Sequence, residues 1–382
     1  MLCGTPANAV FRQRLTTRVT IVARALVKGP PMTVDMAPEH YTATLATQTY
    51  RRYAFTGRDA HDVAVWQASF RPTLRRALGL DVIAQRGRGP LDPQRQSQET
   101  LDDHVRELWT IESEPGFRLP FYLLRPLEQD GPRPVVLTPH GHGKRGKATY
   151  VGLVGDDEDA AKINEGERDI ALQAVREGYV AIAPDMRGFG PLRTAADIER
   201  DAGNSCDTLQ KKALLFGRTL IGERVWDIGR LIDYAATRRE ADISRIMITG
   251  NSGGGTISLF AAACDERISL AAPGSYFCTF ADSIGSIHHC PCNFVPGIMS
   301  MGEMYDVAGL IAPRPFLAVN GVEDPIFPID ATRRAHGELR RIYAAAGAEP
   351  WCRLYEGDGG HRYYKADVWP FAAECFEAVA VG

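Results

Sequence analysis

The chain has 382 residues, of which 45% are hydrophobic and 24% are charged, and its formal net charge is −3. This composition is that of an ordinary globular protein with a large core, and it offers no basic excess that would attract nucleic acid. No stretch of about 18 apolar residues occurs, so we expect no membrane span.

The N-terminal stretch is basic, and no acidic residue precedes Asp35. An apolar run from Val19 to Val27 is interrupted by Arg24, which leaves it shorter than the hydrophobic region of a signal peptide. We predict that residues 1–35 form a disordered extension. Eight scattered cysteines agree with a cytoplasmic, reducing location, with export through the extension as the alternative.

Apolar residues recur at helical spacing from His61 to Leu80, where Pro72 should kink or divide the helix. Arg86 to Gln98 is polar and basic and contains glycine and proline, which predicts a loop. We expect residues 36–103 to form a helical segment that packs on a main domain comprising residues 104–382.

The main domain alternates predicted strands and helices. His104 to Glu112 and Phe117 to Leu124 are predicted strands joined by a tight turn. Further predicted strands lie at 134–138, 179–183, 245–249, 268–272, 315–319 and 351–355. Predicted helices lie at 166–177, 207–217, 222–238, 256–264, 329–346 and 364–379. This order predicts an α/β fold whose mostly parallel sheet carries helices on both faces, with functional sites at the carboxyl ends of the strands.

The strand at 245–249 runs into Gly250-Asn251-Ser252-Gly253-Gly254, a G-x-S-x-G turn followed by a predicted helix. This context is typical of a nucleophile elbow, in which glycines on both sides allow a sharp corner. The corner exposes the Ser252 hydroxyl and directs the N–H of Gly253 toward a developing negative charge. The alternative is an ordinary turn with Ser252 as the helix N-cap.

A base and an acid follow in the order that such a nucleophile needs. Asp324 lies on the loop that leaves the strand at 315–319, and Glu323 beside it is the second candidate. His361 closes a glycine-rich loop after the strand at 351–355. Ser252, Asp324 and His361, each after its own strand, predict a catalytic triad.

An early strand ends in Pro139-His140-Gly141-His142-Gly143. We expect the backbone N–H of His142 to complete an oxyanion hole with that of Gly253, and His140 to contact the substrate. The two histidines could instead bind a metal, but matching acidic or thiolate partners are few nearby in the sequence.

The irregular segment 274–301 is expected to form a loop or lid over the site. Its His288, Cys290 and Phe294 are predicted to shape the acyl or alcohol pocket. Two histidines and two cysteines within five residues also suggest zinc, but their spacing cannot readily fill one tetrahedral site and no second pair lies nearby. We therefore predict no metal, and leave open a disulfide between Cys290 and Cys292 or between Cys278 and Cys290.

Arg187 lies beside Gly188 on a loop at the carboxyl end of a predicted strand. A contact with substrate is one interpretation. A structural salt bridge to Asp185 or to another nearby acid is the other, and we favour it.

These motifs together resemble the α/β hydrolases, and within them the dienelactone-hydrolase-like and acetyl-xylan-esterase-like branch. The resemblance extends from about Pro120 to the C-terminus, and it also includes the runs at 184–190 and 310–315. Two departures separate the chain from the branch's best-known members. Phe189 stands where multi-acetyl carbohydrate deacetylases have glutamine, and Ser252 stands where dienelactone hydrolases have cysteine.

The resemblance implies a serine esterase that works by acyl transfer. Ser252 would attack the ester carbonyl, His361 would carry its proton to the leaving alkoxide, and Asp324 would orient the imidazole. We expect a small-molecule ester with a short acyl group, such as acetyl, or one linked to a carbohydrate. The mechanism needs no cofactor, and it is compatible with a homo-oligomer.

Two other functions stay open. A serine peptidase of the oligopeptidase type shares the fold and the order of the triad, but no propeller-sized domain precedes the hydrolase part of this sequence. A non-catalytic binding protein on the same fold is disfavoured, because such proteins often lose a triad residue and this chain has all three.

Overall fold

The computed structural model describes residues 38–128 and 130–381. The extension predicted at 1–35 lies outside this range. The chain divides into two units between Leu45 and Ala46. Helix α1 (Pro38–Gln48) begins in the first unit, and the rest of the description concerns the second.

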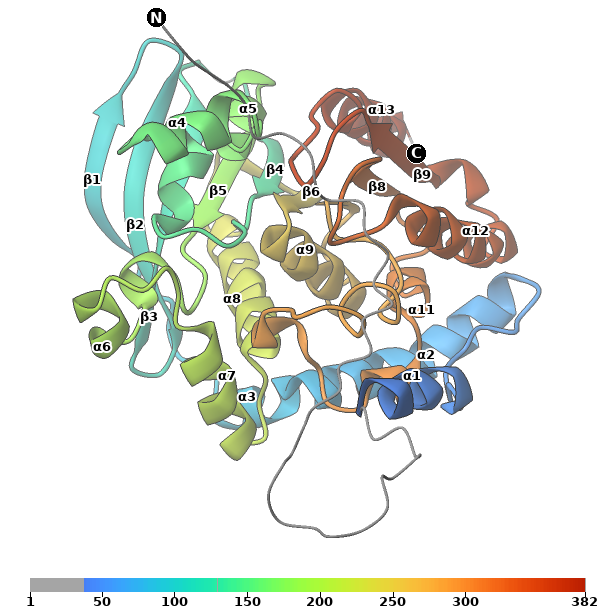
Figure 1. Ribbon diagram of the computed structural model, residues 1–382. Helices are drawn as coiled ribbons and strands as arrows, with labels where there is room; N and C mark the ends of the chain where they lie inside the picture. Colours follow the sequence, from blue (N-terminus) through green and yellow to red (C-terminus); the bar gives the residue numbers. More distant parts are fainter. Residues whose placement is uncertain (1–37, 129, 382) are drawn as a thin grey trace, which may run out of the picture. The chain divides into compact units, whose positions relative to one another are not determined.

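A nine-stranded sheet organises the second unit (Figure 1). Its strands are ordered β1-β2-β3-β5-β4-β6-β7-β8-β9 from edge to edge. The neighbours from β1 to β5 pair antiparallel, whereas all neighbours from β5 to β9 pair parallel. The strands are β1 (Gln94–Thr100), β2 (His104–Glu114), β3 (Phe117–Pro126), β4 (Arg133–Leu137), β5 (Val180–Pro184), β6 (Ala241–Asn251), β7 (Leu270–Gly274), β8 (Phe316–Gly321) and β9 (Cys352–Gly357).

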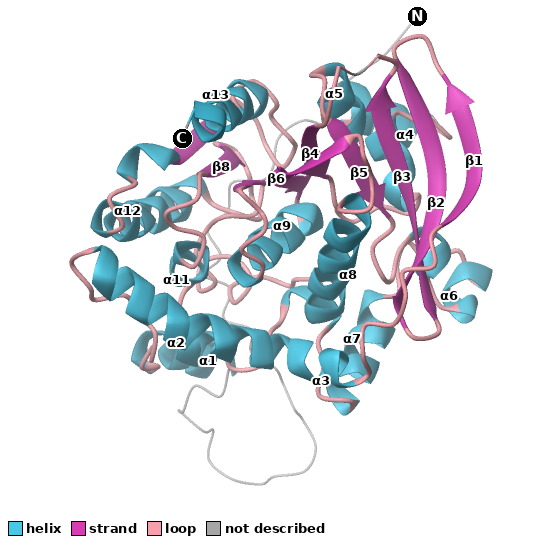
Figure 2. Ribbon diagram, turned by 180° about the vertical axis from the view of Figure 1, so that it is seen from behind, coloured by secondary structure: helices cyan, strands magenta, loops and turns pink. Residues whose placement is uncertain are grey.

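The central strands bury both of their faces. In β4, Val135 and Leu137 belong to one core cluster, and Val136 between them belongs to the other. Since successive side chains of a strand point to opposite faces, the two clusters lie on the two sides of the sheet. Helices α2, α8, α9 and α12 contribute to the first cluster, and α5 and α13 contribute to the second (Figure 2). This confirms the α/β fold predicted from the sequence.

The described residues outside the sheet include a series of helices. None of those in the described residues is both long enough and apolar enough to cross a membrane. Besides α1 they are α2 (Ala60–Leu78), α3 (Leu80–Gln85), α4 (Asp157–Asn164), α5 (Ile170–Arg176), α6 (Ala195–Glu199), α7 (Cys206–Leu215), α8 (Leu220–Ala235), α9 (Gly253–Cys264), α10 (Ile298–Met301), α11 (Met304–Gly309), α12 (Ile329–Ala345) and α13 (Val368–Val381).

The segment predicted to be helical, 36–103, differs from the expectation in two respects. Pro72 does not divide α2, which runs without a break to a C-cap at Gly79. The loop predicted over Arg86 to Gln98 ends in strand β1, at the edge of the sheet. Every residue of β1 is exposed. An edge strand held to β2 through its backbone needs no alternation of apolar residues, so its polar sequence resembles a loop.

The order of the strands positions the site. β6, β7, β8 and β9 are parallel neighbours, so their carboxyl ends lie along one edge of the sheet. The turns that follow β6, β8 and β9 carry Ser252, Asp324 and His361. Parallel pairing therefore gathers three residues that are far apart in the sequence.

Candidate active site

The turn after β6 holds Ser252 in an unusual backbone conformation. Its φ is 58° and its ψ is −118°, and its side chain makes no capping hydrogen bond to α9. Few residues other than glycine adopt a positive φ, and such strain is typical of functional turns. The Pro139 carbonyl oxygen would lie 2.2 Å from a Cβ at Gly250 and 2.1 Å from one at Gly254. Glycine is therefore required on both sides of a corner that has the form of a nucleophile elbow.

Asp324 and His361 meet beyond the ends of β8 and β9. His361 Nδ1 lies 2.7 Å from Asp324 Oδ2. The other oxygen of this buried carboxylate accepts hydrogen bonds from the backbone N–H groups of Ile326 and Phe327, at 2.8 and 3.2 Å. Glu323, the second candidate for the acid, is exposed and forms no side-chain hydrogen bond in the described residues. The pairing leaves Nε2 of His361 free for proton transfer.

Ser252 is held at the same edge of the sheet by its backbone. Its N–H donates to the carbonyl of Gly274, at the end of β7, over 2.8 Å. Within residues 38–128 and 130–381, no hydrogen bond joins the Ser252 hydroxyl to His361. Catalytic hydrogen bonds are often long before substrate binds and tighten in the complex.

The turn after β4 lies directly against the elbow. A Cβ at Gly141 would come within 2.5 Å of the Asn251 carbonyl oxygen and 3.4 Å of Ser252 Cβ. A Cβ at Gly253 would lie 3.1 Å from Nδ1 of His142. The two residues predicted to form the oxyanion hole, His142 and Gly253, are therefore neighbours of the serine. The N–H groups in the first turn of α9 have no acceptor within the helix.

The segment 289–293 lies over the start of α9. Asn293 accepts a hydrogen bond from the Thr256 hydroxyl at 2.9 Å, and its amide nitrogen lies 3.0 Å from Nδ1 of His289. The ring of Phe327 packs on His289 and on His361, both at 5.8 Å between ring centres. Burial and the nearby His142 and His361 lower the pKa of His289 to about 4, so this imidazole is neutral at neutral pH.

His140 is buried and uses both ring nitrogens on backbone groups. Its Nδ1 lies 2.7 Å from the Gly141 carbonyl oxygen, and its Nε2 accepts the Met186 N–H at 3.0 Å. Burial lowers the pKa of His140 to about 3, which keeps the ring neutral as this pairing requires. No polar atom of the ring is left for the substrate contact expected from the sequence. The side chain instead ties the turn after β4 to the loop after β5.

Arg187 is buried in an ion-pair network. Its guanidinium bonds both oxygens of Asp227, at 2.7 and 2.8 Å, and lies 2.8 Å from Glu114 Oε1. It also covers the ring of Phe117, 4.0 Å from the ring centre. The expected partner, Asp185, pairs with Lys147 instead. The structure thus favours the salt-bridge interpretation, with different acids.

Replacing Arg187 by alanine should destabilise the fold. The change would leave the carboxylates of Asp227 and Glu114 buried without their common cation, which typically costs about 3–5 kcal/mol. Urea unfolding followed by circular dichroism measures this loss. A substrate-binding role would instead raise KM while leaving the free energy of unfolding within about 0.5 kcal/mol of the parent value.

The remaining predicted pocket residues differ in exposure. His288 is exposed, Phe294 is 46% exposed, and Cys290 is half-buried. Beside His361 opens a cleft of mixed charge, whose lining includes the basic residues Lys162, Arg168 and Arg362 and the acidic residues Glu158 and Glu165. Arg168 donates to the His361 carbonyl at 3.3 Å, its Nε is buried without a partner, and no carboxylate in the described residues pairs with it. Arg168 did not stand out in the sequence.

Comparison with known proteins identifies the family of the chain. The model of the abhydrolase family matches residues 45–279, which is more than half of the chain. The chain belongs to the abhydrolase family. A Bacillus subtilis relative named "Putative hydrolase YtaP" is 27% identical over 283 residues, which are 72% of this chain and 88% of the relative.

Solved structures share the abhydrolase fold with this chain. One, from Bacteroides fragilis, is called a "putative acetyl xylan esterase"; it has a TM-score of 0.71 at 18% identity and covers 85% of this chain and 83% of its own. A glucuronoyl esterase from Teredinibacter turnerae has a TM-score of 0.58 at 17% identity and covers 87% of this chain and 90% of its own. At these identities the likeness establishes the fold, and it confirms the resemblance to α/β hydrolases.

Two residues of this abhydrolase site escaped the sequence analysis. Of the adjacent pair, His289 rather than His288 faces the site, and nothing in the sequence distinguishes them. Phe327, three residues after Asp324 on the same loop, packs on the rings of both His289 and His361. Its sequence position gave no sign of these two contacts. Both become visible only when the loops after β7 and β8 are brought together.

Proposed function

We propose that this abhydrolase is a serine-dependent carboxylic ester hydrolase. The observation that carries the proposal is the Asp324–His361 pair, 2.7 Å apart, at the same sheet edge as a serine with φ 58°. A serine that only caps a helix does not require a positive φ, and an ion pair on the surface does not require a buried carboxylate. The combination suits a nucleophile with its base and the residue that orients the base.

The reaction would begin with attack of Ser252 Oγ on the ester carbonyl. His361 Nε2 takes the hydroxyl proton and later gives it to the leaving alkoxide. Asp324 accepts the Nδ1 hydrogen of His361, fixes its tautomer and stabilises the imidazolium. Water then attacks the acyl-enzyme, with His361 again as the base.

The oxyanion would be held by the backbone N–H groups of His142 and Gly253. The contact between the turn after β4 and the elbow supports this assignment, because it brings the backbone of Gly141, next to His142, against Asn251 and Ser252. Such a donor, fixed before the reaction, contributes about 2.7–4 kcal/mol to transition-state stabilisation.

The substrate we propose is a short-acyl ester, such as an acetyl ester, including one carried by a carbohydrate. The segment 289–293 lies against the start of α9 and supports a small acyl pocket. The names of the structural relatives, acetyl xylan esterase and glucuronoyl esterase, agree with esters of carbohydrates.

A panel of substrates tests the proposal. We expect p-nitrophenyl acetate and acetylated sugars to give the highest kcat/KM, with a decline as the acyl chain lengthens. Turnover of dipeptidyl nitroanilides without turnover of any ester would favour a serine peptidase. No turnover of either class would favour a binding protein on this fold.

A further inference from the structure

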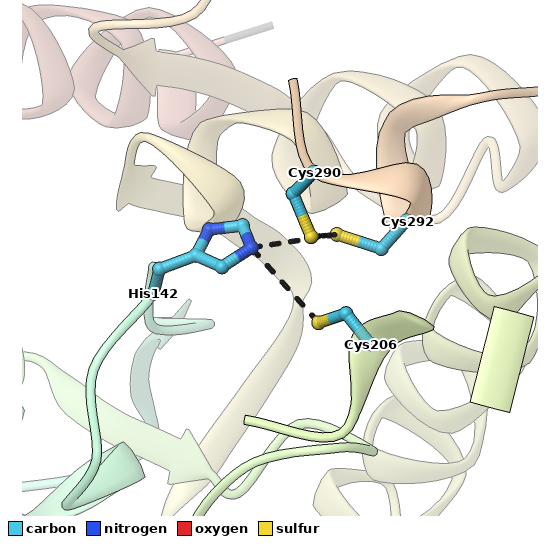
Figure 3. A group of neighbouring side chains, drawn as sticks. All are labelled: His142, Cys206, Cys290 and Cys292. Carbon is cyan, nitrogen blue, oxygen red and sulfur yellow. Dashed lines mark hydrogen bonds between the residues drawn. The ribbon is translucent and has the colours of Figure 1, made fainter. Parts of the chain in front are cut away.

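Three cysteines and one histidine meet beside the elbow, from three separate segments of the chain. His142 comes from the turn after β4, Cys206 begins α7, and Cys290 and Cys292 belong to the segment that overlies α9. Figure 3 shows the four side chains turned toward one another. Their ligand atoms all lie within 4.8 Å of one another.

The two nitrogen–sulfur distances are close to those of a tetrahedral metal site, whereas the Cys290–Cys292 sulfur pair is closer than such a site requires and would have to open by about 0.6 Å. His142 Nε2 lies 3.5 Å from Cys292 Sγ and 3.9 Å from Cys206 Sγ, and the sulfurs of Cys290 and Cys292 are 3.2 Å apart. With zinc–sulfur bonds of about 2.3 Å and zinc–nitrogen bonds of about 2.0–2.1 Å, a regular tetrahedron has N···S edges of about 3.5 Å and S···S edges of about 3.8 Å. The cysteines are free thiols rather than a disulfide.

The charge around the cluster supplies independent support. Arg224 is only 1% exposed, and its guanidinium donates to Cys206 Sγ at 3.3 Å and to the Arg187 carbonyl oxygen. In the part of the chain that the structure describes, no carboxylate forms an ion pair with Arg224. A buried cation needs a counter-charge. Three thiolates around Zn²⁺ carry a net charge of −1, which Arg224 neutralises.

The histidine is also oriented for this role. Its Nε2 faces the sulfurs, its Nδ1 faces Gly253, and its ring meets the edge of Phe189 at 5.1 Å between centres. This orientation turns one ring nitrogen, Nε2, toward the three sulfurs (Figure 3).

From these contacts we propose that His142, Cys206, Cys290 and Cys292 bind a structural Zn²⁺. Four protein ligands close the coordination sphere, so the ion has no open position for substrate or water. The ion would cross-link three parts of the chain: the turn after β4, the start of α7 and the segment 289–293. Since His142 also offers a predicted oxyanion N–H, the ion would act on catalysis by positioning that turn.

The site could not be predicted from the sequence, because its ligands lie far apart along the chain. Cys290 and Cys292 supply only half a set, and the sequence analysis found no second pair nearby. The structure supplies it from His142 and Cys206, which lie 148 and 84 residues before Cys290 in the chain.

Metal content and cobalt substitution test the proposal without reference to activity. The full chain is incubated with zinc sulfate under reducing conditions and then desalted. Inductively coupled plasma mass spectrometry should then find one zinc ion per chain. Co²⁺ in its place should give the intense visible bands of a tetrahedral thiolate site. Removing zinc with a chelator should lower the melting temperature, and adding zinc should restore it.

Substitutions localise the metal. Cys206→Ser and Cys292→Ser should each lose the zinc, whereas Cys375→Ser, which alters a buried cysteine on the other face of the sheet, should retain it. Wild-type protein that retains no zinc and gives no cobalt bands would overturn the proposal, and this result does not depend on whether a variant folds. Zinc retained in full by a folded Cys292→Ser protein, or a Cys290–Cys292 disulfide that persists under the reducing conditions of the zinc incubation, would also overturn it.

Discussion

Ser252→Ala should lower kcat/KM for p-nitrophenyl acetate by about 10⁴- to 10⁶-fold, because it removes the only atom that we expect to form the acyl-enzyme. Alanine has the smaller side chain and no capping hydrogen bond is lost, so the free energy of unfolding should change little. Initial rates and a parallel thermal melt measure the two quantities on the same preparation.

Ser244→Ala is the matched control for this experiment. Ser244 lies on the same strand, β6, but it is exposed, and its hydroxyl donates to the carboxylate of Asp242. It should keep the parental rate. Equal rates for the Ser252→Ala and parent proteins would refute the assignment of Ser252 as the nucleophile.

Asp324→Asn should lower kcat by about 10⁴-fold with little change in KM, the effect known when the acid of a serine triad is replaced by its amide. The amide would have to keep accepting the Ile326 and Phe327 N–H groups, so its NH₂ group would face His361 Nδ1. That arrangement selects the tautomer with hydrogen on Nε2, which cannot take a proton from Ser252.

Glu323→Gln separates this effect from a general loss of negative charge. Glu323 is adjacent and exposed, and its side chain is not bonded to His361. The variant should retain the parental kcat. If Glu323→Gln lost activity and Asp324→Asn kept it, the acid would be Glu323 and the 2.7 Å contact would be incidental.

Much of the fold could be predicted from the sequence because its elements carry strong local signals. The buried strands are short apolar runs, such as Val135 to Leu137, and the elbow has glycines that no other residue could replace. Chain order then placed an acid and a base after later strands. Strand β1 could not be predicted, since an exposed edge strand shows no apolar alternation.

The site was less predictable where its residues are joined only by tertiary contacts. The sequence predicts a salt bridge from Arg187 to Asp185 or to another nearby acid, but it cannot indicate that the partners are Asp227 on α8 and Glu114 on β2. His140 was predicted to contact the substrate. Its ring nitrogens instead bond to the backbone of Gly141 and Met186, and a sequence does not reveal such bonds. The cluster of His142, Cys206, Cys290 and Cys292 was likewise invisible in the sequence, because only tertiary contacts bring these four residues together.

The central claim, that Ser252 forms an acyl-enzyme, is tested most directly by trapping that intermediate. The protein is treated with a slowly hydrolysed p-nitrophenyl ester, quenched in acid, and analysed by intact mass spectrometry and peptide mapping. We predict one acyl group per chain, on the peptide that contains Ser252, and none in the Ser252→Ala protein. Rapid ester turnover with no acyl adduct, or an adduct on another residue, would contradict it.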